Sequence, residues 1–182
     1  MGGEGRFFRL ALPLLFLAAV VPAGALAAAG RFDGLYGQDP YAYYDYAVGP
    51  LRASLLHLRP PPAFYWPPGY PLLVALASFV VGARPLAGQI VSLVAGGLAA
   101  VFAALLAHEV WPALDARGGA RARLYGPLLA GLAVALCGQV WQSSVVVMAD
   151  TAGLAAATGG AWALARYGRR GDSGGPGWLV LA

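Results

Sequence analysis

The stretch LALPLLFLAAVVPAGALAAA, from Leu10 to Ala29, contains twenty consecutive residues without a charge. A helix of about this length is needed to cross the hydrocarbon core of a bilayer. Arg6 and Arg9 come directly before it, and a cleaved signal peptide would begin in the same way. The apolar part of a signal peptide is shorter, however, at about 7–15 residues. We therefore interpret residues 10–29 as a first membrane span that stays in the protein.

The whole chain has the composition of a membrane protein. Of its 182 residues, 59% are hydrophobic and 11% are charged, values that lie far from those of soluble proteins. All twelve basic residues are arginine, which excludes a P-loop, a pyridoxal-phosphate Schiff base and a catalytic lysine. Cys137 is the single cysteine, so we expect no internal disulfide and no cysteine-based zinc site. The arginines lie between apolar runs, a pattern typical of residues that set the orientation of membrane spans. We therefore expect no nucleic-acid partner.

Further apolar runs predict further spans. They cover residues 86–107, 127–147 and 151–167, and residues 176–182 read as the start of another span that the chain end cuts off. Residues 71–82 are apolar but too few to span easily, so we expect them at the interface. The predicted fold class is an all-α membrane protein, a multi-span helical bundle. Its large outer first loop, about residues 30–85, contains short interfacial helices. We expect residues 1–182 to form a single transmembrane domain, the N-terminal fragment of a longer protein.

The arginines predict which side of the membrane each loop faces. If residues 71–82 do not span, eight arginines lie on the side of the N-terminus and four lie on the other side. If they did span, the RGGARAR cluster at residues 117–123 would face outward, against the positive-inside rule. We therefore expect a cytoplasmic N-terminus and an outer, periplasmic loop in the plasma (inner) membrane. Asp39, Asp45 and Asp150 then lie on the outer side.

The outer loop begins with the acidic and aromatic stretch GQDPYAYYDYA, residues 37–47. Asp39 is a good N-cap and Pro40 suits the first helical position, so we expect a helix on which Asp39, Tyr43 and Tyr46 share a face. The stretch RPPPAFYWPPGYP, residues 59–71, has six prolines and predicts a stiff, extended connector. A helix cap and an interfacial belt of tyrosines would explain these residues. Long ordered loops are nevertheless more often functional.

The outer loop and the segment after it, WPPGYPLLVALASFVVGARPLAGQIVSLVAGGLAAVFAALLAHEVW at residues 66–111, resemble a known family. They are similar to the N-terminal part of the GT-C superfamily of integral-membrane glycosyltransferases. The bacterial branch related to protein mannosyltransferases and lipid A aminoarabinose transferases is the most similar. The stretch QSSVVVMADTAGLAAATGGAWALARY, residues 142–167, also looks like the family's segment that brings a second acidic residue to the outer face. The resemblance covers nearly the whole chain.

The resemblance implies an enzyme of the cell envelope. Its donor would be a sugar on a polyprenyl phosphate held among membrane lipids, and its acceptor a hydroxyl of a lipid, protein or glycan. Asp39 would be the general base of an inverting transfer. Asp150 would be a second acidic residue that positions the acceptor or a divalent metal ion, although a helix cap explains it equally well. Many relatives carry Asp-Glu where this chain has Asp39-Pro40, which puts any role of a second carboxylate there in doubt.

The same implied chemistry needs contacts to the sugar and a cation for the leaving phosphate. Tyr43 and Tyr44 lie beside Asp39 and are candidates to contact the sugar ring. An arginine or a metal can stabilise the phosphate. The candidates on the outer side are Arg52, His57, Arg59 and Arg84. Each of them serves equally well as an anchor at the lipid headgroups.

Two other classes of function remain open. A transporter or channel subunit would carry ionisable residues in the middle of its spans, and this chain has almost none. A non-catalytic scaffold, or an enzyme remnant without its donor-site half, agrees with the cut-off last span, and we expect the chain alone to be inactive. GDSGGP at residues 171–176 resembles a serine-protease segment, but a serine nucleophile needs a histidine base oriented by an acid. The only histidines are His57, predicted on the outer side, and His108, near the inner end of a span, and no strand-rich double barrel can be read here, so we interpret the stretch as a Gly/Ser linker. HEVWP, residues 108–112, lacks the second histidine of a zinc-protease motif.

Overall fold

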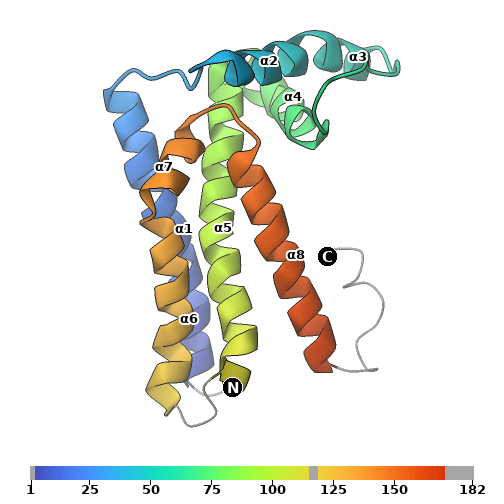
Figure 1. Ribbon diagram of the computed structural model, residues 1–182. Coiled ribbons are helices and arrows are strands. Elements are labelled where there is room, and N and C mark those ends of the chain that lie inside the picture. The colour runs from blue at the N-terminus through green and yellow to red at the C-terminus, as the bar shows by residue number, and fades with distance from the viewer. Residues whose placement is uncertain (1–2, 115–118, 171–182) are drawn as a thin grey trace.

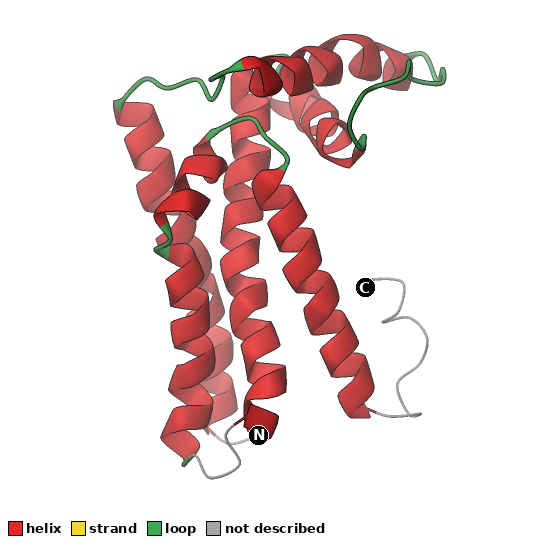
Figure 2. Cartoon of the chain, viewed as in Figure 1, coloured by secondary structure: helices red, strands yellow, loops and turns green. Residues whose placement is uncertain are grey.

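The structure, a computed structural model, describes residues 3–114 and 119–170. Within these ranges the chain consists of helices and the loops that join them, with no strand (Figure 2). The expected all-α fold is confirmed. Four long helices run side by side along the molecule (Figure 1), namely α1 (Gly3–Ala29), α5 (Pro85–Leu114), α6 (Ala120–Ala135) and α8 (Asp150–Arg170).

Two of these helices are long and apolar enough to cross a membrane. They are α1, over Gly5–Ala29, and α5, over Pro85–Trp111, and they contain the predicted spans at residues 10–29 and 86–107. Helix α6 and the following α7 (Gly138–Val145) qualify only as a pair, bent by 53°. The described residues therefore hold two candidate spans, or three if the bent pair forms one.

The predicted span over residues 127–147 is not one continuous helix. Leu136 ends α6 with φ −99° and ψ 1°, and Cys137 is extended with φ −69° and ψ 119°. Residues 151–167 lie within α8 as one helix, but α8 is too polar to qualify as a span by itself. The span expected to start at residue 176 lies outside the described residues.

Helix α5 is the centre of the bundle and contacts α1, α4, α6, α7 and α8. On the side of α8, its buried Ala95 and Ala99 pack with Ala155. Small residues at such spacing let two helices approach closely in a membrane. Helix α8 thus lies along α5 for its length (Figure 1), and its first residues lie near the end of the bundle where α5 begins.

The predicted outer loop forms a layer across that end of the bundle. It contains α2 (Gln38–Tyr46), the π-helical turn η1 (Ala47–Leu51), α3 (Arg52–Leu56) and α4 (Gly69–Val81) (Figure 1). Pro50 lies inside η1; proline cannot donate the usual helical hydrogen bond, which explains the widened turn. With 13 residues, α4 is too short to cross a bilayer, as expected for residues 71–82. The proline-rich residues between α3 and α4 form no helix.

The prediction that Asp39 and Asp150 are N-caps was wrong by two residues for Asp39 and by one residue for Asp150. Helix α2 has Gly37 as its N-cap, with φ +81° and no side-chain cap, so Asp39 and Pro40 are its second and third residues. Glycine adopts a positive φ at little cost, which lets the helix begin before the aspartate. Helix α8 begins at Asp150 itself, and the Ala149 carbonyl accepts a hydrogen bond from Gly153 N–H. Both carboxylates therefore lie in a first helical turn, where the helix dipole favours negative charge.

Candidate functional site

An aromatic cluster fixes α2 against the connector and α4. It consists of Tyr43, Tyr46, Phe64, Trp66 and Tyr70. The ring of Tyr43 stacks on Trp66 with centroids 4.8 Å apart and meets the edge of Tyr70 at 5.4 Å. Tyr46 stacks on Phe64 at 4.1 Å. Because such pairs add to the gain from burial, the cluster holds one face of α2 in a fixed orientation.

Most hydroxyl groups around the cluster are bonded to the protein. Tyr44 donates to the Ala83 carbonyl at 3.0 Å and Tyr46 to the Pro62 carbonyl at 2.8 Å. Tyr70 shares a hydrogen bond of 2.8 Å with Ser92 Oγ and donates to the Gly88 carbonyl.

The Tyr43 hydroxyl differs, because it has no hydrogen-bond partner among the described residues. Tyr43 is 8% exposed, and Trp66 covers one face of its ring. The sugar stacking considered for this tyrosine is therefore blocked on that face. The group that Tyr43 offers to a bound molecule is its hydroxyl.

Asp39 and Asp150 both act electrostatically on that phenol. Burial raises the pKa of Tyr43 above its ordinary value, and the negative charges of Asp150 and then Asp39 raise it further. The two candidate catalytic carboxylates, one from the start of α2 and one from the start of α8, therefore influence the same side chain. Both side chains are exposed, and neither forms an ion pair with a described residue.

Hydrogen bonds tie the beginning of the outer loop to the linker between α7 and α8. The Gln89 side-chain amide donates to the Phe32 carbonyl at 2.9 Å and to the Val145 carbonyl at 3.1 Å. Val147 N–H donates to the Gly34 carbonyl at 3.0 Å. Gly34 has φ +86°, and a Cβ there would lie 2.6 Å from the Gln89 side chain. Only glycine fits this crossing, which sets the path of the chain toward Asp39.

A second group of hydrogen bonds joins α4, α5 and α8 beside Asp150. Ser92 of α5 bonds to Tyr70 of α4, and Thr151 Oγ1 of α8 donates to the Ser92 carbonyl at 3.1 Å. Sequence reasoning missed both Ser92 and Gln89. The signal was present, because they are polar residues three positions apart in the apolar run of residues 86–107 and so share a face. Such residues hydrogen-bond between membrane helices.

The structure does not single out one of the four candidate phosphate-binding residues, Arg52, His57, Arg59 and Arg84. The Arg52 guanidinium lies over the Phe79 ring, 4.9 Å from its centroid, while His57, Arg59 and Arg84 are exposed. No contact within the described residues joins any of the four to Asp39 or Asp150. Arg84 follows Ala83, whose carbonyl accepts the Tyr44 hydrogen bond, so its backbone is tied to the same helix as Asp39.

Asp150 also lines a small recess between α7 and α8. The recess has a volume of about 180 Å³, and its polar lining residues are Gln139, Ser143, Asp150 and Thr151. These side chains can hydrogen-bond to hydroxyl groups. The described residues contain no group of three or more His, Cys, Asp or Glu side chains that could hold a metal ion. A divalent cation at this site would therefore depend on one or two carboxylates together with water and phosphate oxygens, as Mg²⁺ often does.

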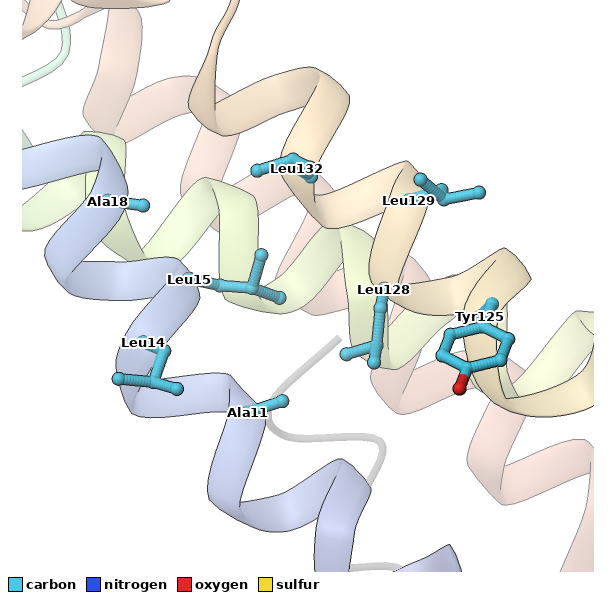
Figure 3. Close-up of a pocket in the computed structure, with 8 residues that line it drawn as sticks. All are labelled: Ala11, Leu14, Leu15, Ala18, Tyr125, Leu128, Leu129 and Leu132. Carbon is cyan, nitrogen blue, oxygen red and sulfur yellow. The ribbon is translucent and has the colours of Figure 1, made fainter. Parts of the chain in front are cut away.

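A larger groove between α1 and α6 has a different character. Its volume is about 420 Å³, and its lining is aliphatic apart from Tyr125. Leucine and alanine side chains of the two helices face each other across it (Figure 3). It carries no carboxylate or histidine, so Asp39, Tyr43 and Asp150 are taken as the candidate site.

The chain matches no family model, no curated protein and no solved structure. A functional assignment therefore depends on the residues of this site and on the resemblance of the outer loop.

Proposed function

We propose that the chain is the N-terminal part of a GT-C-type glycosyltransferase of the plasma membrane. It transfers a sugar from a polyprenyl-phosphate donor to an acceptor hydroxyl at the outer face. The observation that carries the proposal is the joint effect of Asp39 and Asp150 on Tyr43. Two exposed carboxylates from distant parts of the chain act on one phenol, and neither forms an ion pair with a described residue. Such a site suits proton transfer better than structural support.

In the proposed reaction Asp39 is the general base. It accepts the proton of the acceptor hydroxyl as the oxygen attacks the anomeric carbon. The bond from that carbon to the donor phosphate breaks, and polyprenyl phosphate leaves with the bonding electrons. Attack from the face opposite the phosphate inverts the anomeric centre. The exposed position of Asp39 at the start of α2 leaves its carboxylate open to an acceptor.

The other residues would bind and orient the substrates. Asp150 and the recess beside it, with Ser143 and Gln139, would hold the acceptor through its hydroxyl groups. The Tyr43 hydroxyl would donate a hydrogen bond to the bound sugar, since its raised pKa keeps the phenol protonated. Arg84 is the cation that we assign to the leaving phosphate. If the enzyme uses a divalent ion, Asp150 would bind it and the ion would supply charge stabilisation to the phosphate.

The distribution of charge along the bundle supports the proposed sidedness. Asp39 and Asp150 lie at one end. At the other end, Glu109 is paired with Arg166 and Arg169, and Arg6 lies in the first turn of α1. Cytoplasmic segments of membrane proteins carry the excess of arginine. The acidic site would accordingly face the periplasm.

The test is an Asp39→Asn substitution in the full-length gene product. A deletion strain is complemented with the wild type or the variant, and the glycan that the deletion removes is quantified by mass spectrometry. We expect Asp39→Asn to lower transfer about 10²–10⁴-fold, the usual contribution of a general base. Asp45→Asn is the matched control, because Asp45 is an exposed carboxylate of the same helix, and it should leave transfer nearly unchanged.

Membrane insertion of each variant is checked with a cysteine label at residue 60 in a Cys137→Ser background, which should react from outside. Full transfer by inserted Asp39→Asn would overturn the assignment of the base. A deletion strain that lacks no glycan would favour a non-catalytic scaffold.

A further inference from the structure

A second polar site lies at the opposite end of the bundle, between α5 and α8. We call it the inner pocket. It has a volume of about 320 Å³ and is lined by His108, Glu109, Arg166 and Arg169. All four side chains are ionisable, and His108 and Glu109 lie in the last turn of the candidate span Pro85–Trp111, where such residues are unusual. The proposed enzymatic site, at the other end of the molecule, does not use them.

Glu109 holds both arginines of the inner pocket in place. Its Oε1 accepts from Arg166 Nη1 at 2.8 Å, and its Oε2 accepts from Arg169 Nη1 at 3.0 Å. Arg169 Nη1 also donates to the Glu109 carbonyl at 3.2 Å. Glu109 has only 9% of its side chain exposed. Because the carboxylate is fixed in this way, the two guanidinium groups are oriented before any ligand binds.

Only one nitrogen of the Arg169 guanidinium, Nη1, is bonded to Glu109. Its hydrogen bonds to Glu109 all use Nη1, so Nε and Nη2 take no part in this pairing. The side chain is 52% exposed, which leaves this edge accessible. The planar edge of an arginine donates two parallel hydrogen bonds to a phosphate or a carboxylate.

The rim of the inner pocket adds further positive charge. Phe8 of α1 stacks on His108 with ring centroids 4.4 Å apart, so the exposed Arg6 and Arg9 that flank Phe8 lie at this end. Helix α6 begins here too, since Gly126 lies so close to the Trp111 ring that a Cβ on this glycine would clash with it.

The first residues of α6 include two more exposed arginines, Arg121 and Arg123. Among the side chains that the structure describes at this end, Glu109 is the only carboxylate. This end of the bundle therefore carries arginines on α1, α6 and α8, an excess of positive charge that favours anions in general, while the pocket itself is lined only by Arg166 and Arg169 among them.

We propose that the inner pocket binds the phosphodiester headgroup of an anionic phospholipid in the cytoplasmic leaflet, with the free edge of Arg169 as its main donor. A lipid is favoured over a soluble phosphate because the same helix offers apolar surface next to the charge. Leu164, two residues before Arg166 in α8, is 51% exposed, and the Arg166 guanidinium carbon lies 5.8 Å from the centroid of the Trp162 ring. Acyl chains can cover this surface while the phosphate lies among the arginines.

The experiment measures lipid binding to the purified 182-residue chain in detergent by native mass spectrometry. The probes are phosphatidylglycerol and phosphatidylcholine with identical acyl chains. We expect phosphatidylglycerol to bind about tenfold more tightly, and Arg169→Gln to lower its affinity about tenfold, as expected for a lost bond between charged groups. Arg121→Gln is the matched control, an exposed arginine at the same end, and should change the affinity less than about twofold.

Two further measurements separate the alternatives. Arg169→Lys keeps the charge but loses the forked geometry, so it should lose part of the affinity; wild-type affinity in this variant would overturn the proposed contact. Glycerol phosphate should fail to displace phosphatidylglycerol, and full displacement by it would assign the pocket to a soluble phosphate instead. Equal losses in Arg169→Gln and Arg121→Gln would show diffuse attraction and overturn the proposal. A thermal unfolding curve for each variant confirms that the protein measured is folded.

Discussion

The carboxylates at the two ends of the bundle differ in burial and in ion pairing. At the end that holds the inner pocket, which we call the inner end after the proposed sidedness, Glu109 is nearly buried and accepts hydrogen bonds from both Arg166 and Arg169. At the opposite end, called the outer end on the same basis, Asp39 and Asp150 are exposed and have no ion-pair partner among the described residues. Neutral hydrogen bonds of Gln89 and Ser92 join the helices there. The outer end is thus held together without using its acids.

The difference distinguishes a carboxylate that stabilises the fold through ion pairs from carboxylates that are free to take part in a reaction. A carboxylate fixed by two arginines cross-links helices, and removing it leaves unpaired charge behind. Carboxylates that no contact requires can change protonation state without disturbing the fold. Substituting the paired carboxylate should therefore lower the stability of the fold, whereas substituting the unpaired carboxylates should change the site and leave the stability nearly unchanged.

The largest effect on stability is expected for Gly34→Ala at the outer end. A Cβ there would lie 2.6 Å from Gln89 Cγ and 2.9 Å from the Val145 carbonyl, and φ is +86°. Strain and steric conflict together should lower the free energy of unfolding by about 3 kcal/mol. The measurement is thermal or denaturant unfolding in detergent, followed by tryptophan fluorescence.

Gly37→Ala is the matched control for this substitution. Gly37 has a similar φ of +81°, but a Cβ on this residue would have no other atom within 4 Å. It should show only the backbone strain, about 2 kcal/mol for a residue with φ +81° and ψ −175°. Equal losses in both variants would mean that the crossing at Gln89 does not hold the outer loop.

The second prediction compares carboxylates at the two ends directly. Glu109→Gln should lower the free energy of unfolding by about 2 kcal/mol, because Arg166 and Arg169 lose a shared partner and both are partly exposed. Asp39→Asn and Asp150→Asn should each change it by less than about 0.5 kcal/mol, the size of a helix-dipole effect. The same unfolding assay applies. A large loss in either aspartate variant would mean that the outer acids are structural.

Much of the helical layout could be predicted from the sequence. Uninterrupted apolar runs gave the two longest candidate spans, and the dozen apolar residues of α4 were correctly judged too few to cross a bilayer. The break at Leu136 and Cys137 was missed, because no proline or charge marks it in the sequence. Gly37 was missed as a cap because the aspartate two residues later is a stronger sequence signal.

The site could be predicted only in part. Asp39 and Asp150 were chosen from the resemblance and from helix-start patterns, but their joint effect on one tyrosine depends on how α2 is placed against α4 and α8 against α5. Hydrogen bonds of Gln89, Ser92 and Thr151 help to fix these helices and loops, and their partners lie far away in the sequence. Pattern analysis places residues on helix faces but does not identify contacts between distant helices.

The third prediction concerns two buried tyrosines with different hydroxyl environments. Tyr70 bonds to Ser92 and Gly88, so Tyr70→Phe should lower the free energy of unfolding by about 1 kcal/mol and leave Ser92 less satisfied. Tyr43→Phe keeps the aromatic stacking and removes a hydroxyl without a described partner, so it should change the stability by less than about 0.3 kcal/mol. Unfolding in detergent measures both. If Tyr43→Phe is the more costly change, its hydroxyl is part of the structural network.

The smallest expected effect, a change in the pKa of Tyr43, tests the central observation most directly. Burial, Asp150 and Asp39 raise this pKa, in that order. The phenol therefore keeps its proton in the folded protein when the unfolded chain begins to lose it near pH 10. Its contribution to stability is complete below about pH 10 and disappears as the pH rises through the folded pKa. Near-ultraviolet absorbance titrations, each subtracted from the matching Tyr43→Phe protein, isolate this one tyrosine.

Asp150→Asn should lower the pKa of Tyr43, and Asp39→Asn should lower it by less, because Asp150 has the larger effect. Asp45→Asn should not change it, since Asp45 instead raises the pKa of Tyr44. An unchanged titration of Tyr43 in Asp150→Asn would mean that Asp150 is not close to the phenol. The two acids would then not share a site, and the proposed transfer reaction would lose the geometry on which it depends.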